Sequence, residues 1–195
     1  MNQQYANLYA VLAMCFQHPD DQFIETVEDG TLAATVDEYA RRLGLTAVES
    51  PPEFEGSPQE AYLRTFEGFE GGGYAPPAES VYRPWWDGTD RGILSGPPAH
   101  DMERRYEAVD IETPAAYPAD HVALELEYAS LLLDYGADEE YVAFAETRLD
   151  WVPEFRERIE RTSDVEFYVW AARTLETVVE RTLVVLEGGD TFDGQ

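Results

Sequence analysis

The sequence contains no lysine, and all 13 of its basic residues are arginine. Against these stand 40 Asp and Glu residues, so the formal net charge is −27 at pH 7. Proteins that bind nucleic-acid phosphates need clustered cations, and this composition excludes a nucleic-acid partner. An anionic membrane surface is disfavoured for the same reason.

The scarcity of positive charge also indicates the solvent in which the chain works. A charge of −27 makes a compact chain repel itself in dilute buffer. At roughly 1 M salt the Debye length is only about 3 Å, and the repulsion is screened. We therefore expect a halophilic protein adapted to a very salty cytoplasm. Direct binding of cations or of a basic partner is the alternative explanation.

Cysteine and long hydrophobic runs are equally scarce. Cys15 is the only cysteine, which excludes an internal disulfide and gives no pair for zinc. The apolar stretch 8–16 is too short to span a bilayer. Residues 12–15 resemble a lipoprotein cleavage site only faintly, because no basic residue precedes them. We expect Cys15 to be buried in a helix and the protein to be cytoplasmic, without stable membrane insertion.

What is present is helical periodicity along almost the whole chain. Hydrophobic residues make up 44% and aromatic residues 13% of the sequence, enough for a core and too much for an acidic disordered chain. No strand alternation or heptad run interrupts the helical spacing. The pattern predicts an all-α fold, a single globular bundle of about eight to ten helices. The expected helices are residues 3–18, 20–29, 31–43, 57–69, 99–109, 119–135, 138–150, 153–161 and 164–187.

Glycine and proline divide this domain, which we place at residues 1–187. A helical N-terminal part, 1–70, and a helical C-terminal part, 99–187, flank a long loop at 71–98. Loops of this length are usually functional or disordered, and the aromatic residues of this one argue against disorder. Residues 188–195 are expected to form a frayed acidic tail.

The most suggestive polar group is Asp120-His121, followed by Glu125, at the start of the most apolar predicted helix. Asp120 is expected to cap that helix, and His121 to be partly buried and hydrogen-bonded. A catalytic pair would need a nucleophile, and no G-x-S-x-G context surrounds any serine. A metal site would need more ligands at helical spacing. Neither a catalytic nor a metal site is therefore expected.

Two segments of the long loop could bind a ligand. The run 71–73 resembles a phosphate cradle but lacks the Lys-Ser/Thr of a P-loop, so a flexible joint is the better interpretation. Segment 75–86 joins paired prolines to aromatic side chains. It could cover the core of its own domain, or present a groove for an extended or helical peptide.

Three segments together resemble the TorD/DmsD/NarJ family of cytoplasmic redox-enzyme maturation chaperones. They are residues 62–66 (YLRTF), 75–82 (APPAESVY) and 117–128 (YPADHVALELEY). The resemblance continues through residues 151–155 and 167–171 and includes the opening segment 8–12. It implies a TorD-like all-α chaperone that is not an enzyme and needs no cofactor of its own.

The resemblance also implies a partner. Such chaperones bind the N-terminal twin-arginine leader of a molybdopterin oxidoreductase catalytic subunit during cofactor insertion and before export. The client could be of the dimethyl sulfoxide, trimethylamine oxide or nitrate reductase type, and the chaperone a monomer or a homodimer. Rival hypotheses are a helper protein that binds a nucleotide or the pterin cofactor, and a permanent structural subunit of a redox complex.

The leader-binding residues that the resemblance implies lie in segments 75–82 and 117–128, and Phe66 is expected to lie beneath them. Ala78 departs from the bulky aromatic that several members carry after the prolines, and Trp85 or Trp86 could supply the missing ring. An apolar leader segment suits the aromatic loop, and in high salt it should carry most of the affinity. The candidate site residues are Phe66, Pro76, Pro77, Glu79, Ser80, Tyr82, Trp85, Trp86, Asp120, His121 and Glu125.

Overall fold

The computed structural model describes residues 2–68, 73–83 and 96–189 of the chain. All regular elements in these ranges are helical, and the one β-type pairing is an isolated bridge, so the predicted all-α class is confirmed. The elements are α1 (Asn2–Cys15), α2 (Asp21–Glu28), α3 (Thr31–Leu43), α4 (Pro58–Tyr62), the π-helix η1 (Leu63–Glu67), the 3₁₀ turn η3 (Glu79–Val81), α5 (Pro97–Ala108), α6 (Val122–Asp134), α7 (Asp138–Arg148), α8 (Val152–Thr162) and α9 (Glu166–Gly189).

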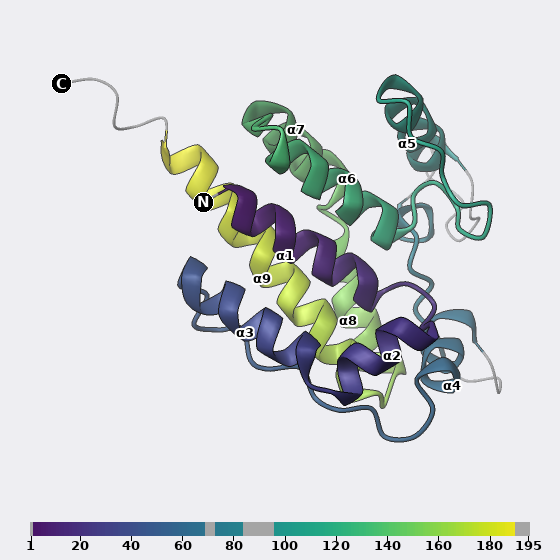
Figure 1. Cartoon of the computed structure of the whole chain (residues 1–195). Helices are drawn as coiled ribbons and strands as arrows, with labels where there is room; N and C mark the ends of the chain where they lie inside the picture. The colour runs from purple at the N-terminus through teal and green to yellow at the C-terminus, as the bar shows by residue number, and fades with distance from the viewer. Residues whose placement is uncertain (1, 69–72, 84–95, 190–195) are drawn as a thin grey trace.

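Helix α1 is the centre of the bundle. It packs against α6, α3 and α9, and Figure 1 shows it lying between α6 and α9. The apolar positions expected to face inward, which include Cys15, are fully buried. Helix α5 stands to one side of this group and packs on η3. The C-terminal helices therefore enclose the N-terminal one, and residues far apart in sequence share a core.

An aromatic cluster joins this core to the segment that follows α4. The ring centroids of Phe16 and Phe155 are 5.7 Å apart, and those of Phe66 and Tyr168 are 4.6 Å apart in an edge-to-face contact. Such pairs add about 0.5–1.5 kcal/mol each beyond the area that they bury. Phe66 on η1 also contacts the rings of Phe16, which directly follows α1, and of Phe155 on α8, so three parts of the bundle hold it.

Local signals account for where most helices begin and end. The Asp20 carboxylate accepts a hydrogen bond from the Phe23 amide at the start of α2. The Ser57 hydroxyl caps α4 by accepting from the Glu60 amide, with Pro58 in the first turn. Gly44 ends α3 with a φ of +67°, a left-handed conformation that favours glycine.

Some boundaries differ from the sequence prediction. The helix expected at 57–69 is a single α-turn followed by η1, which ends at Glu67 and is capped by Gly68. A side chain there would collide with the Tyr74 ring, whose nearest atom would lie 2.8 Å from an added Cβ. Helix α5 begins two residues before the predicted position 99, and α9 ends at Gly189 rather than 187.

We expect Leu12→Ala to lower the free energy of unfolding by about 2–5 kcal/mol, because it opens a cavity in the fully buried face of α1. Urea unfolding followed by circular dichroism in molar potassium chloride measures this. Met14→Ala, at an exposed position of the same helix, is the matched control and should change the value by about 0.5 kcal/mol or less. Equal losses from the two substitutions would contradict the central place of α1.

Candidate functional site

An apolar pocket of about 380 Å³ lies where three segments meet: the end of α4 with η1, the segment 74–81, and the segment 116–121. Aromatic rings and prolines form most of its surface, and Glu67 at the rim is the one charged side chain among the described residues that line it. The lining residues are Tyr62, Phe66, Glu67, Tyr74, Pro76, Pro77, Ala78, Val81, Ala116, Tyr117, Pro118 and His121.

Backbone hydrogen bonds hold the 77–80 segment against the start of α6. The Val122 amide donates to the Pro77 carbonyl at 2.8 Å, and the Glu79 amide donates to the Asp120 carbonyl at 3.0 Å. Between these bonds, Ala78 and His121 form an isolated antiparallel bridge. One wall of the pocket is therefore a two-stranded contact between segments more than 40 residues apart, which helical periodicity does not reveal.

Asp120 fixes the same contact through its side chain. Its carboxylate oxygen Oδ2 accepts from the Ser80 amide at 2.7 Å, and the whole residue is buried. Burial raises the pKa of Asp120, while the hydrogen bonds from Ser80 act in the opposite direction. The expectation that Asp120 caps its own helix was wrong: the carboxylate serves η3, across the site.

His121 takes the capping position instead. Its Nδ1 accepts from the Ala123 amide at 3.2 Å, so Nδ1 carries no proton. Burial lowers the pKa of His121 to about 3, which keeps the ring neutral and places its proton on Nε2. Within the described residues Nε2 has no hydrogen-bond partner, and the ring lies 4.3 Å from that of Tyr117. A histidine in the lining of the apolar pocket thus has one unused N–H donor, which is buried.

Behind this wall lies a pair of fully buried carboxyl groups, Glu79 and Glu125. Glu79 is ion-paired with Arg83 at 2.8 Å and with Arg148 at 3.2 Å. The Oε2 atom of Glu125 accepts from the Trp151 indole at 3.1 Å. Burial, reinforced by the charges of Glu79 and Asp120, raises the pKa of Glu125 well above its ordinary value. A neutral Glu125 next to an ionised, arginine-bound Glu79 is the arrangement that follows.

Tyr82 completes the support of the loop. Its ring stacks on Trp151 with centroids 5.0 Å apart, and the Arg158 guanidinium lies over it at 5.6 Å. Arg158 also donates to the Tyr74 carbonyl at 2.8 Å. Helix α8 therefore holds both ends of the loop that forms the pocket.

Comparison with known proteins identifies the family. Residues 29–158 match the family model described as nitrate reductase delta subunit. The chain belongs to this family, the NarJ/TorD-type redox-enzyme maturation chaperones. A solved structure from Archaeoglobus fulgidus, provisionally described as a redox enzyme maturation protein, shares the fold with a TM-score of 0.55. It is 18% identical, and the alignment covers 90% of this chain and 93% of that one. No curated protein matches.

For this chaperone-family member, the structure places the predicted site residues in two layers. Phe66, Pro76, Pro77 and His121 line the pocket. Five others lie buried behind it, namely Glu79, Ser80, Tyr82, Asp120 and Glu125. Trp85 and Trp86, which were expected to supply an additional ring, lie outside the described residues.

Sequence reasoning missed several lining residues of this family member. Tyr62 and Tyr117 belong to the segments that resemble the family, but neither was predicted to line a binding site. For Tyr62 the signal was its spacing: it lies one helical turn before Phe66, and the two aromatic rings contact each other in the core. Exposed Ala116 gave no signal at all.

No group of three or more His, Cys, Asp or Glu side chains among the described residues is arranged to hold a metal ion. No helix in the described part of the chain is both long enough and apolar enough to cross a membrane.

We expect Glu125→Gln to fold and to change how stability depends on pH. Because the folded-state pKa of Glu125 is raised, its contribution is fully present below the ordinary value of 4.5 and is lost as pH rises through the folded-state pKa. The introduced glutamine would keep the Trp151 hydrogen bond without a titrating proton. The variant should therefore gain stability relative to the wild type as pH rises from about 5 to 8.

Melting temperatures across this pH range, in constant molar salt, measure the difference between the two proteins. Glu140→Gln, at an exposed position of α7, removes one carboxylate without touching the site and is the control. A difference between Glu125→Gln and wild type that stays constant with pH would show that Glu125 is ionised in the fold.

Proposed function

We propose that this protein is a cytoplasmic chaperone that binds the N-terminal leader of the catalytic subunit of a molybdopterin oxidoreductase. The leader is of the twin-arginine type, and it is held during cofactor insertion and before export. The client is of the dimethyl sulfoxide, trimethylamine oxide or nitrate reductase type. On this proposal the protein supplies a binding surface and catalyses no reaction.

The observation that carries the proposal is the chemistry of the apolar pocket. Its floor is buried aromatic and proline surface, which suits the apolar stretch of a leader. His121 lines the pocket and its Nε2–H is buried without a partner in the described residues, so a peptide carbonyl that reached it would satisfy both groups. Glu67 at the rim, on a chain of charge −27, suits the basic head that precedes the apolar stretch.

The same chemistry disfavours a nucleotide or the pterin cofactor as the ligand of this pocket. A phosphate group needs arginine, lysine or a row of free backbone amides. The charged lining residue in the described part of the pocket is a carboxylate, and the wall segment begins with two prolines, which have no N–H. A peptide therefore fits the pocket better than either rival ligand.

Ala116→Trp should block the pocket without disturbing the fold, because Ala116 is exposed at the rim. We expect the dissociation constant for the cognate leader to rise about tenfold or more, which corresponds to about 1.4 kcal/mol. Calorimetric titration in molar potassium chloride, with synthetic leaders from the molybdoenzymes of the same host, measures it. A leader whose apolar run is made polar should lose affinity in the same way.

Ala115→Trp is the matched control, because Ala115 is exposed in the same turn but does not line the pocket. Both variants should melt near the wild-type temperature. If Ala115→Trp and Ala116→Trp weaken the leader equally, or if neither does, the pocket is not where the leader binds.

A further inference from the structure

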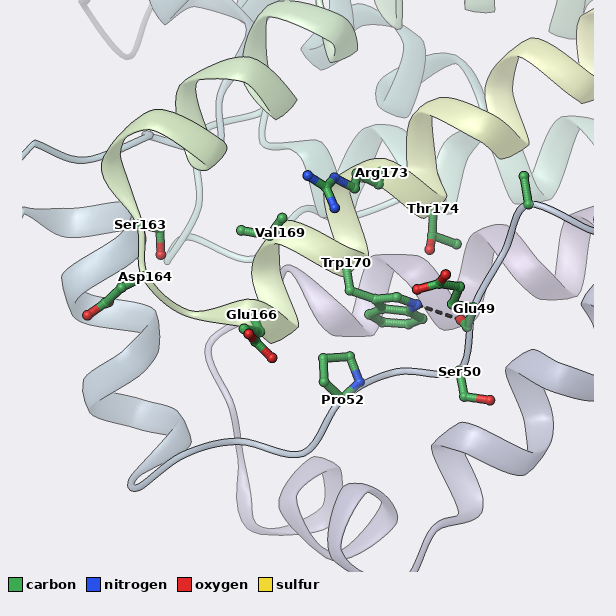
Figure 2. A pocket seen from close by; sticks show the side chains of 11 residues that line it. Glu49, Ser50, Pro52, Ser163, Asp164, Glu166, Val169, Trp170, Arg173 and Thr174 are labelled. Atoms are coloured by element: carbon green, nitrogen blue, oxygen red, sulfur yellow. Dashed lines mark hydrogen bonds between the residues drawn. The ribbon is translucent and has the colours of Figure 1, made fainter.

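A second and larger cavity, of about 650 Å³, lies where the segment 47–52 crosses the beginning of α9 (Figure 2). It shares no lining residue with the apolar pocket and contains none of the predicted site residues. Its lining residues are Ala47, Glu49, Ser50, Pro52, Ser163, Asp164, Glu166, Val169, Trp170, Arg173 and Thr174.

One side of this cavity is apolar and firmly held. The Trp170 indole donates to the Glu49 carbonyl at 2.7 Å, which fixes the ring to the 47–52 segment. Pro52 and Val169 extend the apolar surface beside it, as Figure 2 shows. A surface of this kind accommodates the methylene stem of a long side chain.

Thr174 places a hydroxyl group in the same cavity. The residue is only 3% exposed, and its hydroxyl makes no hydrogen bond to any described residue. In Figure 2 this hydroxyl is turned toward Trp170 and Glu49. The Thr174 oxygen is not among the buried side-chain atoms that lack a partner, so a ligand in the cavity can reach it and form a hydrogen bond.

The remaining polar groups of the cavity are mainly acceptors. Glu49, Asp164 and Glu166 contribute exposed carboxylates, and none of them forms an ion pair within the described residues. The Nε of Arg173 donates to Glu160, outside the cavity, at 2.6 Å. The cavity thus offers carboxylate acceptors, and its one cation among the described residues is paired through Nε with an outside carboxylate.

This combination fits an arginine side chain. A guanidinium group has five N–H donors and no acceptor, and its stem is apolar. The cavity is far larger than a bare cation needs, and these carboxylates are not among any group arranged for a metal ion in the described residues. Lysine would bring charge but not the planar set of donors that the neighbouring Glu49 carboxylate and Thr174 hydroxyl, side by side in Figure 2, can share.

The position of the cavity relates it to the apolar pocket. Ser163, at its edge, hydrogen-bonds the Thr65 hydroxyl at 2.8 Å, and Thr65 is the neighbour of Phe66 in the pocket floor. We propose that this cavity is a second subsite, which receives an arginine side chain from the basic head of the client leader. The proposal rests on the leader-binding function proposed above.

A double-mutant comparison tests the subsite in 0.5 M and in 2 M potassium chloride. The protein variants are Thr174→Val and the pair Glu49→Gln with Glu166→Gln, and the cognate leader is compared with versions carrying Lys or Gln for its arginines. In 0.5 M salt we expect the carboxylate pair variant to weaken the native leader about fivefold. On that variant, replacing the leader arginines should have little further effect. Salt at 2 M should reduce the loss without abolishing it.

Thr177→Val is the matched control for Thr174→Val, because it lies one turn further along α9 and its hydroxyl bonds the Arg173 carbonyl instead. A second measurement reports the location directly. The indole ¹⁵N–H signal of Trp170, assigned with Trp170→Phe, should shift when the native leader is added and remain in place with the Gln-substituted leader.

The outcomes separate the two proposals. In one outcome the leader binds and Ala116→Trp weakens its binding, but the affinity losses from the protein and leader substitutions add independently and the Trp170 signal stays in place. The arginine subsite is then wrong, and leader binding stands. If no leader binds the wild type, both proposals fail. Non-additive losses together with the Trp170 shift establish the subsite.

Discussion

Asp120 holds the candidate site together, because its backbone and its side chain both bind the segment that forms the pocket wall. The Asp120 carbonyl accepts from the Glu79 amide and its carboxylate accepts from the Ser80 amide. A buried backbone N–H that loses its partner costs about 1–3 kcal/mol, so each of these bonds matters to the position of the loop. The next residue, His121, is thereby placed in the lining of the pocket, with Nδ1 bound to α6 and Nε2 without a partner in the described residues.

The hydrogen bonds from Asp120 also determine which charged groups lie behind the pocket wall. The segment that Asp120 holds brings Glu79 into the interior, next to Glu125. A chain with 13 arginines against 40 acids places two of those arginines, Arg83 and Arg148, on this one carboxylate. Glu79 is fully buried, and the two partly buried arginines offset the cost of taking its charge out of water. The proton on Glu125 and the arginines on Glu79 therefore make a buried acidic cluster compatible with a folded, strongly acidic chain.

Much of the fold could be predicted from local signals. Proline, glycine and capping residues mark the helix ends, and the apolar periodicity of α1 correctly identified its buried face. The start of α6 was predicted three residues too early, because Asp120 and His121 resemble a helix start, while the chain there is engaged in a bridge to Ala78. Glu125 has the spacing of a residue that flanks the apolar stripe of a helix, yet it is fully buried. Long-range pairing decides both cases, and no local pattern encodes it.

The candidate site residues came from the family resemblance more than from physical reasoning, and their role stays a prediction. Resemblance marked the 75–82 and 117–128 segments, and the structure brings them together around one pocket. The cavity at Trp170 gave no comparable signal, because its residues come from a loop and a distant helix turn. Neither the unpaired hydroxyl of Thr174 nor the engagement of Arg173 could be deduced without the folded contacts.

Amide hydrogen exchange of Asp120→Ala, with leader affinity measured on the same samples, tests the central claim most directly. If Asp120 builds the pocket wall, exchange of the Ser80 amide should accelerate while α1 and α9 remain protected. Leader affinity should then fall about tenfold or more. Asp120→Asn, which keeps an oxygen acceptor, should recover part of the protection of the Ser80 amide and part of the leader affinity. The account would be contradicted if exchange of the Ser80 amide did not change, or if it accelerated while the leader affinity stayed the same.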